Sequence, residues 1–95
     1  MARIHGHIVS LDLPTTLLDL SNGGFLMQSP VLFPVGAVEE FRFTAGDTVL
    51  VVRARVVHAM TTSRSDGMVY LTGLEFVEPD EEQRDAIARL VAIAS

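Results

Sequence analysis

The stretch Asp19-Leu20-Ser21-Asn22-Gly23-Gly24 decides which fold to expect for this chain. Its Asn22-Gly23 pair is a strong short-range signal for a tight hairpin, because both residues tolerate the positive φ angles of a type I′ turn. Apolar residues lie on both sides of the pair. We therefore predict two antiparallel strands, Thr15–Leu20 and Gly24–Gln28, joined by a type I′ turn at Asn22-Gly23.

The residues beside this turn have the chemistry of a binding site. Asp19 and Ser21 are two positions apart, so in an extended strand they point to the same face. The Asp19 carboxylate can accept paired hydrogen bonds from the N1–H and N2–H₂ edge of a guanine, with the Ser21 hydroxyl as a second contact. The alternative is purely local, since Asp and Ser beside a turn often hydrogen-bond only to their own backbone.

Four further strands are expected from the apolar pattern. In the clearest, Thr48–His58, apolar residues alternate with residues that place Arg53 and Arg55 together on the outer face. The other predicted strands are Ile4–Ser10, Ala37–Thr44, with Phe41 and Phe43 on one face, and Met68–Val77. Loops or connections are predicted at Leu11–Pro14, at Ser29–Gly36 and at Thr61–Gly67, which ends in the turn pair Asp66-Gly67.

One helix is predicted, over Pro79–Ala94. Asp80 suits the N-cap and Gln83 the N3 position, which together make a capping box. An apolar stripe follows at helical spacing, formed by Ile87, Leu90, Val91 and Ala94. Strands with regularly spaced turn signals, followed by one short helix, predict a small antiparallel barrel with a C-terminal helix.

The composition limits the class of protein. With 95 residues, 48% of them hydrophobic, the chain is long enough for one compact core, so a single domain over residues 1–95 is expected. It contains no Cys, which excludes disulfides, thiolate catalysis and Cys-ligated metals. Met1–His7 lacks the apolar core of a signal peptide, and no apolar run reaches membrane-spanning length. We expect a cytoplasmic protein that does not insert into a membrane.

The charge balance argues against DNA or RNA as a partner. Twelve acidic residues face seven basic ones, all of them Arg, for a net charge of −5. General nucleic-acid binding needs a clustered positive surface. A small dianion needs only a few local guanidinium groups, so an acidic protein can still bind one.

The Asp-x-Ser-x-x-Gly pattern of Asp19 to Gly24 resembles the second signature motif of PilZ domains, the bacterial receptors for cyclic di-GMP. The similarity extends over roughly residues 15 to 93. Its further segments are Pro34-Val35-Gly36, Ala54-Arg55-Val56-Val57, Gly73-Leu74-Glu75-Phe76-Val77 and the helix from near Asp80. The resemblance implies an all-β fold: a six-stranded antiparallel barrel, with strands within about residues 4–77 and a terminal helix at about 80–94.

The resemblance also implies a ligand, cyclic di-GMP, and its site. Asp19 and Ser21 would hold one guanine, and Gly24 would let the backbone approach it. The family's first motif is Arg-x-x-x-Arg, whose planar guanidinium groups suit phosphate and guanine. Here that spacing runs from Arg3 to His7, so Arg3 alone would touch phosphate. With one arginine missing, binding should be weak.

Other residues support fewer functions. His5 and His7 would share a face of their strand, but nothing near them supplies further ligands, so no metal site is expected. His58 is interpreted as a half-exposed strand residue, and Arg53 and Arg55 as a solvated face paired with acids. No arrangement of catalytic residues stands out, so the protein is not expected to be an enzyme.

A second function remains open. The apolar loop segment Val31–Val35 either packs over a barrel end or contacts a protein partner. The alternative to a nucleotide receptor is therefore a PilZ-like adaptor or oligomerisation module that binds protein and no nucleotide.

Overall fold

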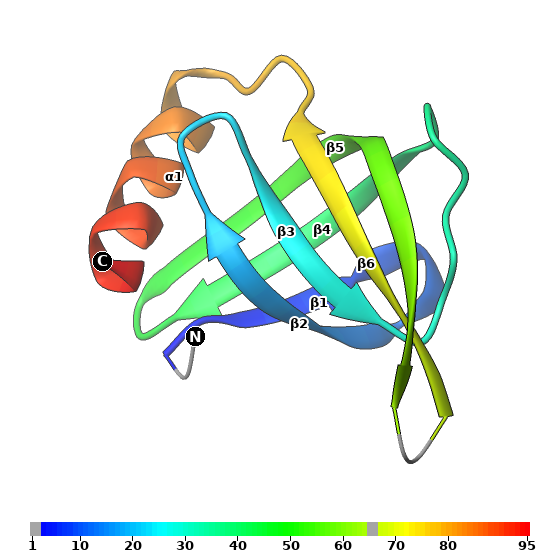
Figure 1. Ribbon diagram of the computed structural model, residues 1–95. Coiled ribbons are helices and arrows are strands. Elements are labelled where there is room, and N and C mark those ends of the chain that lie inside the picture. The colour runs from blue at the N-terminus through cyan, green and yellow to red at the C-terminus, as the bar shows by residue number, and fades with distance from the viewer. Residues whose placement is uncertain (1–2, 65–66) are drawn as a thin grey trace.

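In the computed structural model, which describes residues 3–64 and 67–95, six antiparallel strands close into a barrel (Figure 1). The strands are β1 (His5–Ile8), β2 (Leu13–Leu20), β3 (Gly24–Ser29), β4 (Val38–Ala45), β5 (Thr48–Arg64) and β6 (Gly67–Phe76). Around the barrel their order is β1-β2-β3-β6-β5-β4. The helix α1 (Glu81–Ala94) follows β6. The predicted six-stranded barrel with a C-terminal helix is confirmed.

Three predicted segment boundaries are wrong. The connection predicted at Leu11–Pro14 is too long, because Leu13 and Pro14 already belong to β2 and pair with Ile8 and His7 of β1. The first strand ends at Ile8, and the next three residues form a 3-10 turn, η1 (Val9–Leu11), that leads through Asp12 at a φ of 51° into β2. The predicted loop Thr61–Gly67 is strand as far as Arg64, because Thr61–Arg64 pairs with Gly67–Tyr70 of β6. Asp66 lies outside the described residues. The polarity of Thr61–Arg64 indicated a loop, but its two threonines are β-branched and fit a strand that pairs with β6.

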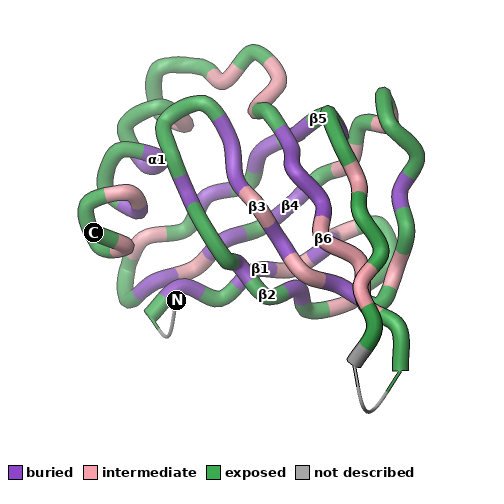
Figure 2. The backbone as a smooth tube through the Cα atoms, in the orientation of Figure 1, coloured by how far each residue is buried: buried purple, intermediate pink, exposed green. Residues whose placement is uncertain are grey.

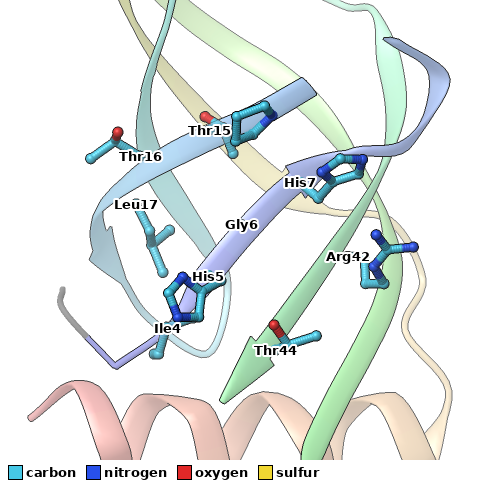
Figure 3. Close-up of a pocket in the computed structure, with 10 residues that line it drawn as sticks. Ile4, His5, Gly6, His7, Thr15, Thr16, Leu17, Arg42 and Thr44 are labelled. Atoms are coloured by element: carbon cyan, nitrogen blue, oxygen red, sulfur yellow. The ribbon is translucent and has the colours of Figure 1, made fainter. Parts of the chain in front are cut away.

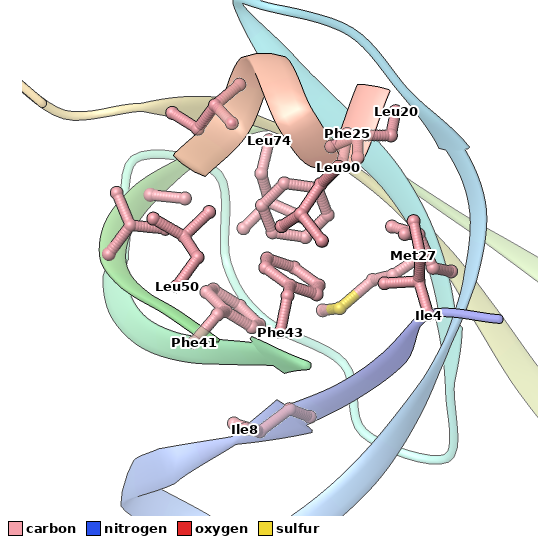
Figure 4. Packing of buried hydrophobic residues seen from close by; sticks show 14 of the residues in the cluster. Ile4, Ile8, Leu20, Phe25, Met27, Phe41, Phe43, Leu50, Leu74 and Leu90 are labelled. Carbon is pink, nitrogen blue, oxygen red and sulfur yellow. The ribbon is translucent and has the colours of Figure 1, made fainter. Parts of the chain in front are cut away.

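The barrel interior is filled by alternate residues of each strand, as the banding along the chain shows (Figure 2). At its centre, Phe25 meets Phe41 and Phe43 edge to face, with ring centroids 5.0 and 4.9 Å apart. Phe41 and Phe43 are both fully buried, which confirms that they share one face of β4. Figure 4 shows this aromatic group packed with Met27 and Leu90. Such edge-to-face pairs add stability beyond the apolar area that they bury.

Helix α1 closes one end of the barrel. Asp80 accepts a hydrogen bond from the Gln83 amide at 2.8 Å, and the Gln83 side chain accepts one from the Asp80 amide at 2.9 Å, so the predicted capping box is present. Ile87 and Leu90 are buried in the core, and Val91 and Ala94 pack against it. Within the described residues, no helix is both long enough and apolar enough to cross a membrane.

The loop between β3 and β4 is partly buried against the core and partly exposed. Phe33 is buried in the core and Val31 packs against it, whereas Leu32 and Val35 are exposed. Pro34 and Gly36, with a φ of 94° at Gly36, form a turn whose carbonyl at Pro34 accepts from the Ala37 amide at 3.1 Å. The loop is thus ordered and non-helical, as predicted.

The turn between β2 and β3 is not type I′, because neither Asn22 nor Gly23 has a positive φ. The Ser21 amide donates to the Gly24 carbonyl at 2.9 Å, and the Gly23 carbonyl accepts from the Phe76 amide at 3.0 Å. The second bond ties the turn to the end of β6. A tertiary hydrogen bond therefore overrides the local preference of Asn-Gly for the primed turn.

Gly24, rather than Gly23, is the glycine that the fold requires. A Cβ added at Gly24 would overlap the carbonyl oxygen of Leu74 on β6, whereas one added at Gly23 would meet nothing within 4 Å. The overlap is with backbone, which cannot swing aside. Gly24, which is expected to let a ligand approach the backbone, lets the neighbouring strand approach it.

We predict that Gly24→Ala lowers the free energy of unfolding by roughly 1–3 kcal/mol, because β3 and β6 must move apart to make room. Gly23→Ala is the matched control and should change stability by no more than about 0.5 kcal/mol. Urea unfolding of both variants measures the difference. Equal loss of stability in the two variants would contradict the close β3–β6 approach.

Candidate functional site

The outer face of the barrel carries one row of four residues that two β-bulges frame. Asp19 on β2 pairs with Leu26 on β3, Leu26 with Gly73 on β6, and Gly73 with His58 on β5. The register shifts between Leu17 and Asp19 on β2, and between Val56 and His58 on β5. Each bulge adds one residue to its strand and re-aims the side chain after it. Asp19 and His58 thereby stand at opposite ends of the same row.

This row forms the floor of an open groove of about 300 Å³. The groove is lined by Asp19, Ser21 and Gly24 from the hairpin, and by His58, Val57 and Gly73 among others from β5 and β6. Three of the four residues predicted for the ligand site therefore lie together. The buried Leu20 between Asp19 and Ser21 confirms that these two point outward to the same side.

Both polar side chains of the hairpin make local hydrogen bonds. Asp19 Oδ1 accepts from the Leu20 amide at 3.0 Å, and Ser21 Oγ donates to the Gly24 carbonyl at 3.3 Å. These are the turn contacts of the local interpretation. They leave Asp19 Oδ2 without a hydrogen-bond partner in the described part of the chain, and the carboxylate is exposed. Asp19 is therefore held in place while it keeps an acceptor directed at solvent.

His58 owes its position to the glycine beside it. An ideal Cβ on Gly73 would lie 2.7 Å from His58 Nδ1, and nearer still to Nε2 and Cε1. The imidazole therefore occupies the space that any other side chain at position 73 would take. The sequence interpretation missed this residue as part of the site. A glycine in the middle of a predicted strand was the available signal, because such a glycine often marks a close approach.

Arg3 does not reach this groove. It lines a different cavity with Ala45, Gly46 and Ile93, the last of which lies near the C-terminal end of α1. His7, four residues on, lies on β1, with its Nε2 2.8 Å from Asp12 Oδ1. The Arg3 to His7 spacing thus contributes no side chain to the groove beside the hairpin.

A second groove of about 450 Å³, with a mixed polar and apolar lining, crosses β2, β1 and β4 (Figure 3). His5 pairs with Thr44 and His7 with Arg42 across β1 and β4, so the two histidines share the outer face as predicted. Within the described residues, no group of three or more His, Cys, Asp or Glu side chains could hold a metal ion. The groove has two imidazoles and no carboxylate among its lining residues.

The arginines of β5 add little positive charge to the hairpin groove. Glu75 pairs in register with both Gly24 and Arg55, and Arg55 Nη1 lies 3.2 Å from Glu75 Oε1. Both side chains are about half exposed, so the ion pair is weak, but it partly neutralises the Arg55 guanidinium. This pairing is the solvated arrangement expected for Arg55.

Comparison with known proteins agrees with this geometry. Residues 3–92 match the PilZ domain family. A comparison with curated proteins found no match. The fold is similar to the crystal structure of an uncharacterized Legionella protein, with a TM-score of 0.58 and 13% identity over 97% of this chain and 82% of that one. PilZ domains are non-catalytic binding domains, typically receptors for cyclic di-GMP. Because the family match spans nearly the whole barrel and helix, the chain belongs to the PilZ domain family.

Proposed function

We propose that this domain binds cyclic di-GMP weakly in the groove between Asp19 and His58 and acts in bacterial signalling by binding alone. The observation that carries the proposal is the row Asp19–Leu26–Gly73–His58, which places an acceptor and a histidine at the two ends of the groove floor. Backbone bulges fix the positions of Asp19 and His58 at the two ends of this row, so the site is in place before a ligand binds.

Asp19 is suited to read a guanine edge. Its free Oδ2 and its turn-bound Oδ1 lie on one exposed carboxylate, which accepts the two donors N1–H and N2–H₂. The Ser21 hydroxyl lines the same groove and lies within one strand repeat of Asp19. Gly24 does not serve the ligand directly in this proposal, because its missing Cβ faces β6.

Scarcity of positive charge explains why binding is weak. Among the residues that line the groove, His58 is the only basic one. Arg3 and Arg42 line other cavities, and Arg55 is paired with Glu75. Loss of one charge-assisted bidentate contact costs on the order of 1.5–3 kcal/mol, which corresponds to at least about tenfold in affinity. We assign His58 the role of donating a ring N–H to the ligand phosphate.

Calorimetric titration with cyclic di-GMP tests the guanine-reading role of Asp19. Asp19→Asn should abolish measurable binding, because an amide offers one acceptor where the carboxylate offers two. Its melting temperature should match that of the parent chain, since position 19 is exposed and its amide oxygen can still accept from the Leu20 amide. Binding by Asp19→Asn equal to the parent would refute the role, and no binding by the parent at millimolar ligand would favour the adaptor function.

A second prediction separates the role of His58 from the fold. Gly73→Ala should displace the imidazole, because the new methyl group takes its place, yet it should cost little stability since a surface side chain can swing away. We expect Gly73→Ala and His58→Ala to weaken cyclic di-GMP binding to a similar extent, by about tenfold. Unchanged affinity in both variants would show that His58 takes no part in binding. Leu26→Ala on the same row is the control for loss of an apolar contact alone.

A further inference from the structure

The second half of β5 has a free edge. β5 spans 17 residues, but β4 pairs only with Thr48–Arg55. Val56 then hydrogen-bonds to Gly36 and Ala37, each at 2.8 Å. From Val57 to Ser63, β6 is the only strand that pairs with β5 in the described part of the chain. One side of this segment therefore has backbone N–H and C=O groups that no other described strand pairs with, and its last residues enter the ribbon of β5 and β6 that projects from the barrel (Figure 1).

This segment has few of the features that usually protect a free strand edge. Proteins blunt such edges with Pro, with Lys or other charges, with very short strands or with β-bulges. A bulge lies only at its start, between Val56 and His58. The sequence of Val57–Ser63 is Val-His-Ala-Met-Thr-Thr-Ser, which contains no Pro, no Lys or Arg and no acidic residue. In a chain of net charge −5, an edge of seven residues without a carboxylate can approach another copy without direct repulsion between carboxylates.

We propose that Val57–Ser63 pairs antiparallel with the same segment of a second copy of this chain, about a two-fold axis at Met60. Such an interface is isologous, so each copy supplies the edge that the other needs. Centred on Met60, the pairing sets His58 against Thr62 and Ala59 against Thr61, and it places no like charges opposite each other. All seven edge residues are used in this register.

The side chains agree with that axis. Met60 is 58% exposed and pairs with Leu71 of β6. At the two-fold axis, Met60 would meet Met60 of the second copy. A continuous apolar row would then run across the interface from Leu71 of one copy, through the two Met60 side chains, to Leu71 of the other. A shift by one residue would turn Met60 to the opposite face from its symmetry mate and break this row.

The pairing also joins the sheets of the two barrels along their free edges. In each copy β3 pairs with β6 as far as Tyr70, which faces Thr61 of β5, so only the last residues of the edge lie on a two-stranded ribbon. Such a ribbon is marginally stable alone, and a further strand supports it. Seven residues a side give an interface below the usual size for a permanent dimer, so association should be reversible. The two copies are both acidic and repel each other, and salt screens this repulsion, so association should be stronger at higher salt.

One consequence connects this interface with the groove, and it rests on the proposed function, although the pairing itself does not. His58 ends the row that begins at Asp19, and Thr62 of the second copy would stand directly beside it. The dimer would thus extend the groove by a hydroxyl group. Nucleotide binding and association should then strengthen each other, because linkage is reciprocal.

Sedimentation of the chain without nucleotide, from micromolar to millimolar concentration, tests the pairing. We expect a monomer–dimer equilibrium that Met60→Lys weakens at least about tenfold, because two ammonium groups would meet at the axis. Val49→Lys is the matched control: Val49 is also 58% exposed and also on β5, but in the part that β4 covers. It should dimerise as the parent chain does.

Charge reversal tests the register. Met60→Glu alone should also fail to dimerise, but an equimolar mixture of Met60→Lys and Met60→Glu should recover association, because the axis brings position 60 onto position 60. Thermal melts verify that both variants are folded. A parent chain that stays monomeric at millimolar concentration, or Met60→Lys that dimerises like the parent, would overturn the proposal. Failure of the mixture to recover would overturn the two-fold register at Met60.

Discussion

The pairing of β3 with β6 is the contact on which the rest of this structure depends. It joins residues about fifty positions apart in the chain and requires Gly24 to lie directly against the Leu74 carbonyl. Phe25, the next residue, then points into the barrel between Phe41 and Phe43. Closure of the sheet, the aromatic centre of the core and the floor of the hairpin groove all follow from this one approach of two backbones.

The two bulges show how the barrel carries a site without loss of its core. Within β2, Leu17 and Leu20 are both buried although they are three residues apart, because the bulge absorbs one position between them. Leu18 and Asp19 are consequently both exposed. The same device on β5 turns Val57 and His58 outward while Val56 stays inside. A regular ladder would have aimed one member of each pair at the core.

The distribution of arginine accounts for the limits of the proposed site. Guanidinium groups are the best partners for phosphate, yet those of Arg3 and Arg42 lie on other parts of the barrel, and Arg55 is paired with an acid. A groove whose own basic residue is a histidine suits weak, adjustable binding. A free edge next to that histidine offers a route by which self-association would complete the groove.

Much of this architecture was readable from local signals. The hairpin, the capping box at Asp80, the paired faces of Phe41 and Phe43 and the barrel with its terminal helix follow from turn chemistry, capping and apolar alternation, which act between near neighbours. The chemistry of the turn residues indicated Asp19 and Ser21 as candidates, and the resemblance to a known family added Gly24 and Arg3. The sequence misassigned Thr61–Arg64, because a short polar segment of this kind becomes strand only when a partner strand is present.

By itself, then, the sequence determined which residues form the elements and which faces enter the core, since both depend on periodicity along one segment. Only the tertiary structure decided the turn type at Asn22-Gly23, the need for glycine at Gly24 and the place of His58 opposite Asp19. Each of these depends on β6, a strand that is remote in sequence from β2 and β3. Register between distant strands is set by closure of the barrel, and no local propensity encodes it.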